Sequence, residues 1–529
     1  MNLLHTLRNA LLCSLFSGGL SAQMLIVSAP EYMEEMKPFV AWKTQKGMEV
    51  QLVSTAETGH TQAELKQYVA EHYATHHNRY LLLVGDATQV PTHISYGITN
   101  PTSTSAYSDS EYGYLTPGSY PPQILVGRFS AESAADVRTQ VERSVAYERD
   151  ITSSATWLGR AIGITDPKAT ELGDNNETDI QHIRKLNKVL AEYGYSTEEV
   201  STKGKLLENL RNGCGLIQYV GHGYQSSWGT TGFNTTDIAE LTNTGRLPII
   251  ISAACLNGHF RLGTCFGEAL LRARTTEGQA TGATAIMAFS TSIHWNPPML
   301  GQDEFTRILT TTETLPNEKK TLGEVMNAAY RQVIATYKGS GEDVSQQWIL
   351  FGDPSLMLRS KAPAPIEAEL PATIAPGSSE LIITKAEAGT IAALSKGEEL
   401  LACDTLKSHE GILHFPAQEI GEKLQLVLTA FDGETRTQEI TVDNPTGIQS
   451  VQAAMRPQLT AGASAGEFTL FGISPASARI QIYDTESRLL EEYTAEEGST
   501  IRLSLPAGVY LVQILTGDTR HTQKIRIER

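Results

Sequence analysis

From residue 24 to about residue 359, the chain alternates between short, continuously apolar runs and longer amphipathic stretches. Continuous apolar runs are typical of strands that helices cover on both faces, because neither face of such a strand meets water. Regular alternation of strand and helix favours an α/β fold with doubly wound, mostly parallel sheets. We predict strands at residues 24–27, 50–53, 80–84, 124–127, 215–220, 247–252 and 285–289, and helices at residues 63–76, 134–149, 179–193 and 266–274.

The pattern changes near residue 361, where Pro363, Pro365, Pro371 and Pro376 lie close together and predict a linker. Short strands at regular spacing follow, which is typical of a small β-sandwich. A second linker begins near residue 443, and the all-β pattern then resumes. We therefore predict two α/β subdomains (residues 23–150 and 151–360) with two sheets side by side, followed by two small all-β sandwich domains (residues 361–445 and 446–529).

The first 22 residues have the organisation of a secretory signal peptide. A positively charged start is followed by a short apolar stretch and by small residues that offer a cleavage site before Gln23. A buried first helix of a cytosolic protein is the alternative, but the apolar stretch is short and ends in glycines. No later apolar run reaches the roughly 18 residues that a membrane-spanning helix needs. We expect an exported protein without a transmembrane span.

The composition disfavours some classes of partner and structure. The 529 residues include 42 Lys+Arg and 59 Asp+Glu, so the formal net charge is −17, and no basic cluster is present. This charge balance disfavours a nucleic-acid partner, which needs a basic face. Cys13 lies in the signal, and the four remaining cysteines are too sparse for a disulfide framework. Such sparse cysteines suggest that one is kept for its chemistry.

Two predicted strands end in residues that can carry out catalysis. The strand at 215–220 runs into His222, which glycines flank, and the strand at 247–252 runs toward Cys255. Ligands of open parallel sheets bind beyond the carboxyl ends of the strands, so we expect His222 and Cys255 to face one crevice. An imidazole beside a thiol can take its proton and later protonate a leaving amine. The Gly223 and Cys255 amides are candidate donors to an oxyanion.

Two other interpretations of these residues remain open at this stage. His222 and Cys255 can be ordinary buried residues at strand ends, because free cysteine is commonly buried. A zinc site formed by His222, Cys255, His259 and Cys265 is a second alternative, although its spacing matches no usual ligand pattern.

The segments that carry His222 and Cys255 also resemble a known family. Residues 219–229 (YVGHGYQSSWG) and 253–258 (AACLNG) are similar to the catalytic core of the gingipains, secreted cysteine peptidases of Bacteroidetes with a caspase-like fold. The arginine-specific branch is the most similar. Further blocks follow in family order at residues 82–86, 108–113, 126–130, 179–182, 295–304 and 351–355. The resemblance implies a cysteine endopeptidase with caspase-like, mostly parallel sheets in two subdomains.

Carried over to this chain, the resemblance makes Cys255 the nucleophile and His222 the general base and acid, beside Gly223. The family has a glutamate that orients the histidine, but an ungapped match reaches Lys168, which cannot do so. The nearest carboxylate is Asp166, which we expect in that role after a two-residue shift.

Substrate specificity is expected to depend on Asp179. The resemblance places it at the floor of the first specificity pocket, where a buried carboxylate would bind a guanidinium with two hydrogen bonds. Asp179 also opens a predicted helix, where an acid is favourable in any case. Trp295 is expected to cover the pocket, and Trp228 to line it or to fill the core. Gln225 stands where the relatives have a glutamate, so the pocket loses a charge. A preference for lysine, or for basic residues in general, therefore stays open beside the preference for arginine.

The rest of the resemblance concerns export and partners. Residues 505–512, with Lys524, are similar to the C-terminal sorting domain of type IX secretion cargo, and residues 377–445 to the family's immunoglobulin-like domain. This implies a protein at the surface of, or secreted by, a Gram-negative bacterium, with the type IX machinery as partner. We expect protein and peptide substrates, no cofactor for the chemistry, a reduced thiol, and structural calcium at unknown ligands. The family's long inhibitory N-terminal segment has no counterpart here, so we expect either that latency is controlled otherwise or that the enzyme needs none.

Two further functions remain alternatives to hydrolysis. One is a sortase-like transpeptidase that cuts sorting tails and transfers the new carboxyl end to an amine. The other is a non-enzymatic surface adhesin with a decayed peptidase domain, against which the intact Cys255 and His222 argue.

Overall fold

The computed structural model describes residues 22–95, 106–116, 118–261, 263–311, 321–444, 458–461, 466–471, 477–485, 488–496, 498–516 and 519–527. The predicted signal peptide lies outside them, apart from Ala22. The chain divides into two compact units, Met1–Asp443 and Asn444–Arg529, which are described separately. Within the described ranges, none of the helices combines the length and the apolarity that crossing a membrane requires.

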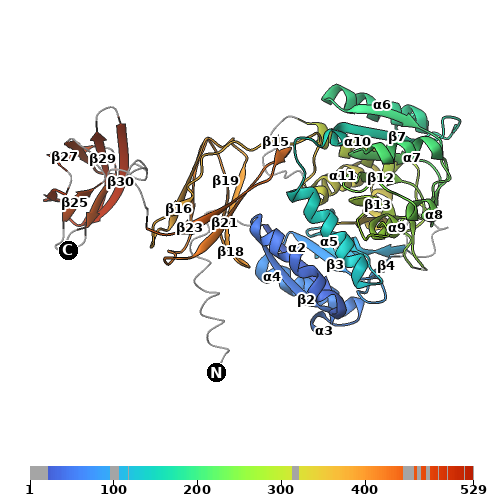
Figure 1. Ribbon diagram of the computed structural model, residues 1–529, viewed down its shortest axis with the longest axis horizontal. Coiled ribbons are helices and arrows are strands. Elements are labelled where there is room, and N and C mark those ends of the chain that lie inside the picture. The colour runs from blue at the N-terminus through green and yellow to red at the C-terminus, as the bar shows by residue number, and fades with distance from the viewer. Residues whose placement is uncertain are drawn as a thin grey trace. The chain divides into compact units, whose positions relative to one another are not determined.

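A ten-stranded mixed sheet forms the centre of the first unit (Figure 1), in the order β2-β1-β3-β6-β14-β13-β12-β9-β7-β8. Neighbouring strands are parallel except at β13–β14, where they are antiparallel. The strands are β1 (Ala22–Ser28), β2 (Met48–Ser54), β3 (Tyr80–Val84), β6 (Leu125–Phe129), β7 (Arg160–Ile164), β8 (Ser196–Val200), β9 (Leu216–Val220), β12 (Ile249–Ala253), β13 (Ala285–Phe289) and β14 (Trp348–Phe351). The seven predicted strands are thereby confirmed.

Helices cover both faces of this sheet, as the continuous apolar runs predict. In β12, Ile249 and Ile251 belong to one apolar core and Ile250 to another. Every face of the strand is therefore buried, which explains why its sequence does not alternate. The helices are α2 (Met33–Gln45), α3 (Thr55–Thr58), α4 (Gln62–His76), α5 (Ala134–Arg149), α6 (Asp179–Tyr193), α7 (Lys203–Asn212), α8 (Thr235–Ala239), α9 (Phe266–Arg272), α10 (Asn296–Thr310), α11 (Leu322–Tyr337) and α12 (Gly339–Gln347).

The two predicted sheets are joined into one. Strand β14 pairs along its length with β13 but meets β6 only at Phe351 and Arg128. Strand β14 is not among the predicted strands, and it joins the N-terminal four strands to the other half. The Arg128 guanidinium at this point is buried and bonds within the N-terminal half, to Asp109 Oδ2 at 2.6 Å and to the Gly85 carbonyl at 2.8 Å.

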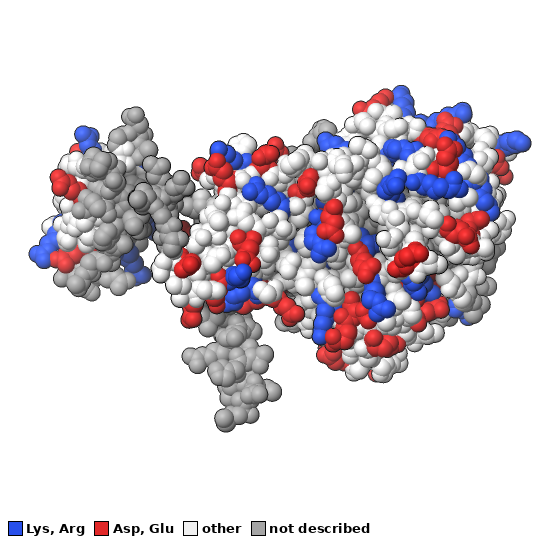
Figure 2. All heavy atoms as spheres, viewed as in Figure 1, with Lys and Arg blue, Asp and Glu red and all other residues white. Residues whose placement is uncertain are grey.

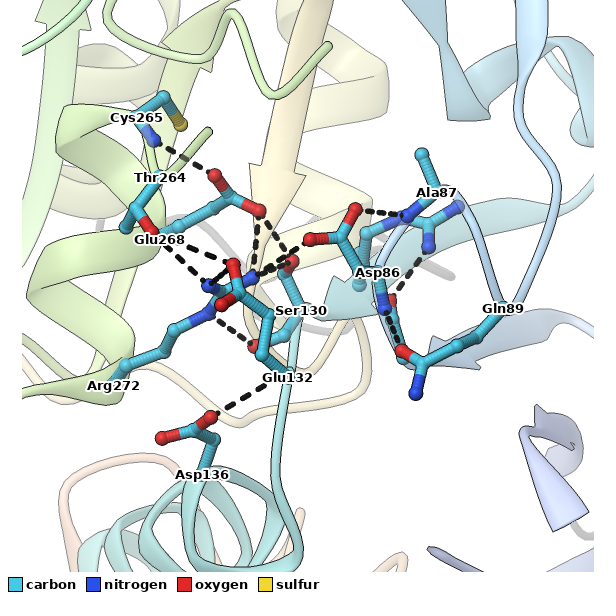
Figure 3. A network of polar contacts seen from close by, with 12 residues as sticks. Asp86, Ala87, Gln89, Ser130, Glu132, Asp136, Thr264, Cys265, Glu268 and Arg272 are labelled. Atoms are coloured by element: carbon cyan, nitrogen blue, oxygen red, sulfur yellow. Dashed lines mark hydrogen bonds and ion pairs between the residues drawn. The ribbon is translucent and has the colours of Figure 1, made fainter. Parts of the chain in front are cut away.

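A polar network connects the two halves of the sheet close to the junction (Figure 3). Arg272 of α9 donates to Glu268 Oε1 and to Ser130 Oγ, both at 2.8 Å, and lies 3.4 Å from Asp86 Oδ2. Ser130 follows β6 and Asp86 follows β3, so α9 is tied to the N-terminal half. Glu268 also accepts the backbone N–H of Cys265 at 2.8 Å, which caps α9. Helix α9 is therefore held at both ends.

The remainder of the chain is all-β, as predicted. In the first unit it forms the five-stranded sheet β16-β23-β21-β18-β19, and α2 packs against β18, β19 and β21. The second unit has a three-stranded sheet, β24-β25-β28, and a four-stranded sheet, β27-β26-β29-β30. The strands are β15 (Ala364–Pro365), β16 (Thr373–Ile374), β17 (Glu380–Thr384), β18 (Ile391–Lys396), β19 (Glu399–Thr405), β20 (Glu410–His414), β21 (Lys423–Thr429), β22 (Gly433–Glu434), β23 (Arg436–Val442), β24 (Gln458–Ala461), β25 (Glu467–Phe471), β26 (Ala478–Tyr483), β27 (Leu489–Ala495), β28 (Thr500–Arg502), β29 (Gly508–Thr516) and β30 (Thr519–Ile527).

Candidate active site

The carboxyl ends of two neighbouring strands bring His222 and Cys255 to the same edge of the sheet. Strands β9 and β12 are parallel partners, and Val220 pairs with Ala253 at their ends. His222 lies two residues beyond Val220, and Cys255 lies two residues beyond Ala253. The His222 side chain is exposed and Cys255 is half-buried. Both residues therefore follow the carboxyl ends of paired strands at the same level of the sheet.

The two loops touch directly behind these side chains. The Gly221 amide donates to the Ala253 carbonyl at 3.3 Å. At Gly223, a Cβ atom would lie only 2.5 Å from the Cys255 carbonyl oxygen and 2.8 Å from Ala254 Cβ. Any side chain at Gly223 would therefore push the histidine loop away from the cysteine loop, which is why the position requires glycine.

Trp295 connects the predicted pocket residue with the predicted base. Its Nε1 donates to Asp179 Oδ1 at 3.0 Å, and its ring centroid lies 5.3 Å from that of His222, edge to face. Asp179, at the start of α6, is only 1% exposed. Burial raises the pKa of Asp179, while the hydrogen bond from Trp295 and the imidazoles of His182 and His222 oppose the rise.

Asp166 lies on the loop after β7, where its side chain is exposed. Its Oδ1 accepts the backbone N–H of Lys168 at 2.9 Å, and no hydrogen bond joins it to His222 within the part of the chain that the structure describes. A role in orienting His222 remains a prediction. Sequence analysis did not single out Glu171, whose charge acts on Asp179 and contributes to its raised pKa.

Gln225 and Trp228 belong to the hairpin of β10 (Gly223–Tyr224) and β11 (Ser227–Trp228), which follows His222 directly. Gln225 Nε2 donates to the His259 carbonyl at 3.1 Å, so this side chain connects the hairpin to the segment after Cys255. Trp228 is 1% exposed and stacks on Tyr219 at 4.6 Å between ring centroids. Trp228 therefore fills the core beneath the hairpin, the second of the two places that we considered for it.

The cysteines differ in their surroundings. Burial raises the pKa of the Cys214 thiol to about 12 and that of the Cys265 thiol well above its usual range, so neither forms a thiolate readily. Cys403 lies in β19 of the all-β part. Cys255 is thus the half-buried thiol at the predicted crevice.

The zinc alternative receives no support from the geometry. Among the described residues, no three or more His, Cys, Asp or Glu side chains form a group suited to a metal ion. His259 Nδ1 instead lies 2.7 Å from the Ser290 carbonyl, and Cys265 is buried at the start of α9. A calcium site built from three or more such side chains is likewise absent from the described ranges.

Comparison with known proteins identifies similar chains. The family model described as peptidase family C25 matches residues 19–359. Gingipain R2 from Porphyromonas gingivalis is 32% identical over 521 residues, which cover 96% of this chain and 68% of that protein. Gingipain R1 from the same species is 33% identical over 426 residues, or 78% of this chain and 42% of that protein. The crystal structure of the Arg-specific cysteine proteinase gingipain R matches with a TM-score of 0.76 at 32% identity, over 80% of this chain and 99% of that one.

Proposed function

The chain belongs to peptidase family C25, and from this premise we propose that it is a cysteine endopeptidase that cleaves peptide bonds after arginine. One observation carries the proposal: the Val220–Ala253 pair places His222 and Cys255 at one sheet edge, next to the buried Asp179. The similar solved structure is described as an Arg-specific cysteine proteinase, which supports both the reaction and the preferred residue.

In the proposed reaction, His222 takes the proton of the Cys255 thiol, and the thiolate attacks the scissile carbonyl carbon. The amides of Gly223 and Cys255 donate to the oxyanion. As the carbon–nitrogen bond breaks, the imidazolium gives its proton to the leaving amine and a thioester remains. His222 then takes a proton from water, which hydrolyses the thioester and releases the thiol. The close contact of the two loops at Gly223 supports this assignment.

Asp179 is the proposed specificity residue. A guanidinium that binds its carboxylate would compensate a charge that burial disfavours, and would hydrogen-bond in a planar geometry that an ammonium cannot reproduce. Trp295, already bonded to Asp179, can pack its ring on the aliphatic part of the substrate side chain. Gln225 is neutral where the family has a glutamate, so we expect lysine to be cleaved more slowly rather than excluded.

The decisive experiment replaces Cys255 with alanine and measures cleavage of a peptide that contains a single arginine. Loss of the nucleophile should lower kcat by several orders of magnitude and leave the melting temperature nearly unchanged. Cys403→Ala is the matched control, because it removes a half-buried thiol from the all-β part and should retain full activity. Turnover that persists in folded Cys255→Ala would overturn the assignment.

The same reaction distinguishes hydrolysis from the alternatives. Mass analysis of the products should show free carboxyl ends after arginine, whereas a sortase-like transpeptidase would leave products joined to an added amine. A decayed adhesin would give no products. The similar solved structure is named as a proteinase, which favours hydrolysis over both.

We also propose that the enzyme is exported. Residues 1–22 would act as a signal peptide and residues 446–529 as a type IX sorting domain, in keeping with relatives from a Gram-negative bacterium. Mass analysis of the exported protein should then show a chain that begins near Gln23, and retention of residues 1–22 would contradict the signal. Activity should need a reduced Cys255, and the need for structural calcium stays a prediction from the resemblance.

A further inference from the structure

A buried asparagine joins the loop that carries Cys255 to the loop that carries His222. Asn257 is fully buried and lies two residues after Cys255. Its Nδ2 donates to the Tyr224 carbonyl at 2.7 Å and to the Ser227 carbonyl at 3.1 Å. Both carbonyls belong to the β10–β11 hairpin, which begins immediately after His222. The two loops are therefore held together by this side chain beyond the point where strand pairing ends.

Two further buried side chains fix the orientation of the Asn257 amide. The indole Nε1 of Trp228 can only donate, and it does so to Ser252 Oγ at 3.0 Å. The Ser252 hydroxyl is then left to donate its own hydrogen to Asn257 Oδ1, which lies 2.9 Å away. The amide oxygen thus faces a donor and the amide nitrogen faces two acceptors. Because all these groups are buried, a reversed amide or a carboxylate in its place would meet repulsive partners.

The backbone beside Asn257 is also tightly held. Leu256 has φ +63°, in the left-handed region that non-glycine residues rarely adopt, so the chain turns sharply after Cys255. Hydrogen bonds hold this turn: the Leu256 amide donates to the Thr291 carbonyl at 3.1 Å, and the Gly267 amide of α9 donates to the Asn257 carbonyl at 2.9 Å. The turn supplies a rigid base from which the Asn257 side chain reaches the hairpin.

On the basis of the proposed function, we propose that Asn257 is a positioning residue that sets the separation of the Cys255 thiol and the His222 imidazole. Direct pairing of β9 with β12 stops at Val220 and Ala253, two residues before each reactive group. Proton exchange between the groups requires hydrogen-bond reach, so a shift of the hairpin of about 1 Å would be costly for catalysis. Asn257 keeps the hairpin in place without contacting substrate.

The substitution Asn257→Asp tests this role, because it keeps the shape of the side chain and replaces the two N–H donors with an oxygen. That oxygen would face the Tyr224 and Ser227 carbonyls, and repulsion should move the hairpin. We expect kcat for an arginyl peptide to fall about a hundredfold, with a smaller change in KM. The rate at which iodoacetamide alkylates Cys255 at neutral pH should also fall, since a displaced imidazole no longer takes the proton of the thiol.

The chain offers a matched control in Asn243, a buried asparagine in the loop that precedes β12. Its amide makes two equivalent bonds with Gly282, Nδ2 to the carbonyl at 2.9 Å and Oδ1 from the amide at 2.9 Å. Asn243→Asp should lower the melting temperature, yet leave the alkylation rate of Cys255 and kcat unchanged. A general loss of stability is thereby distinguished from a loss of positioning.

The outcomes separate the positioning role from the proposed function. If wild-type protein neither cleaves after arginine nor shows rapid alkylation of Cys255 at neutral pH, the proposed function fails, and the role of Asn257 fails with it. If wild type behaves as expected and folded Asn257→Asp keeps its kcat and alkylation rate, only the positioning role is overturned. If Asn257→Asp does not fold, Ser252→Ala removes the bond to Oδ1 together with the acceptor of Trp228 Nε1, and should lower the alkylation rate by a smaller amount. An unchanged alkylation rate in folded Ser252→Ala would overturn the proposal.

Discussion

The Asp179 side chain is buried, and the cost of burying its carboxylate charge is the basis of the proposed specificity. The charge is tolerated because Trp295 donates a hydrogen bond and two imidazoles lie near. An ordinary helix-starting aspartate is exposed and needs no such partners. At the residue scale, the proposed substrate therefore completes a site that is incomplete without a cation.

The raised pKa of Asp179 predicts how binding depends on pH. An amidinium inhibitor such as benzamidine, which presents two N–H donors as a guanidinium does, binds the carboxylate form, so its Ki should rise as acid protonates Asp179, at a higher pH than for an exposed aspartate. Asp179→Asn should weaken inhibitor binding at neutral pH by about 2 kcal/mol, roughly thirtyfold, and remove this pH dependence. The control is Asp136→Asn, which alters a carboxylate of α5 in the N-terminal half that pairs with Arg274. Equal Ki values for wild type and Asp179→Asn would exclude Asp179 from the pocket.

At the scale of elements, a buried glutamine connects helix α10 to β9 and β12. Gln302 Nε2 donates to the carbonyls of Tyr219 in β9 (3.1 Å) and Ile251 in β12 (3.2 Å). Its Oε1 lies 3.2 Å from Nε2 of His182, one turn after Asp179 on α6. Helix α10 begins directly after Trp295. The helices that begin at Asp179 and directly after Trp295 are thus connected to β9 and β12, the strands that precede His222 and Cys255.

This connection predicts a selective effect of Gln302→Leu. The change removes the donor to two buried strand carbonyls and the partner of His182 Nε2, and should lower the free energy of unfolding by about 2–3 kcal/mol. It should also raise the Ki of benzamidine, because Asp179 and Trp295 lose their common support. Gln140→Leu is the matched control, since buried Gln140 makes two comparable bonds, to the Ser130 and Asp136 carbonyls. If both variants change Ki equally, the coupling through α10 is refuted.

At the scale of the whole molecule, charged groups are distributed in two ways. On the described part of the face in Figure 2, acidic and basic side chains are interspersed. In the interior of the first unit, Lys43 of α2 lies 2.7 Å from Glu148 of α5 and 2.5 Å from Asp353, which follows β14. Lys46 also pairs with Glu148. Four buried charges of balanced sign thereby join helices from the N-terminal half to the loop after the central strand.

This buried network predicts that the first unit loses stability in acid. Burial alone would raise the pKa of Glu148, but the charges of Lys43 and Lys46 outweigh it and lower the pKa to about 2. The stabilisation is complete above the unfolded value of 4.5 and is lost as the pH falls from about 4.5 toward 2. Urea unfolding followed by tryptophan fluorescence measures it, because all five tryptophans lie in the first unit.

Glu148→Gln provides the test of this network. It leaves two buried ammonium groups with Asp353 alone, so the free energy of unfolding at pH 7 should fall by about 3–5 kcal/mol and depend less on acid. The exposed Glu240→Gln should change neither quantity. An unchanged acid dependence in Glu148→Gln would show that other carboxylates cause the loss of stability.

The sequence by itself determined the helices and strands and the reactive residues that follow two of the strands. Continuous apolar runs predict β9 and β12 because burial on both faces leaves a local signature, and His222 and Cys255 follow those runs directly. The α/β order and the all-β remainder could be predicted for the same reason. Resemblance to a family added the expected roles of Cys255 as nucleophile, His222 as base and Asp179 as specificity residue.

Only the tertiary structure decided which elements are neighbours and which side chains reach one another. It placed β14 between the two predicted sheets, buried Trp228, left Asp166 exposed and brought Asn257 against the hairpin. None of these facts leaves a periodic signal in the sequence, because each depends on contacts between segments far apart in the chain. The register of Val220 with Ala253 is of this kind: strand pairing, rather than local composition, brings an imidazole and a thiol to one edge of the sheet.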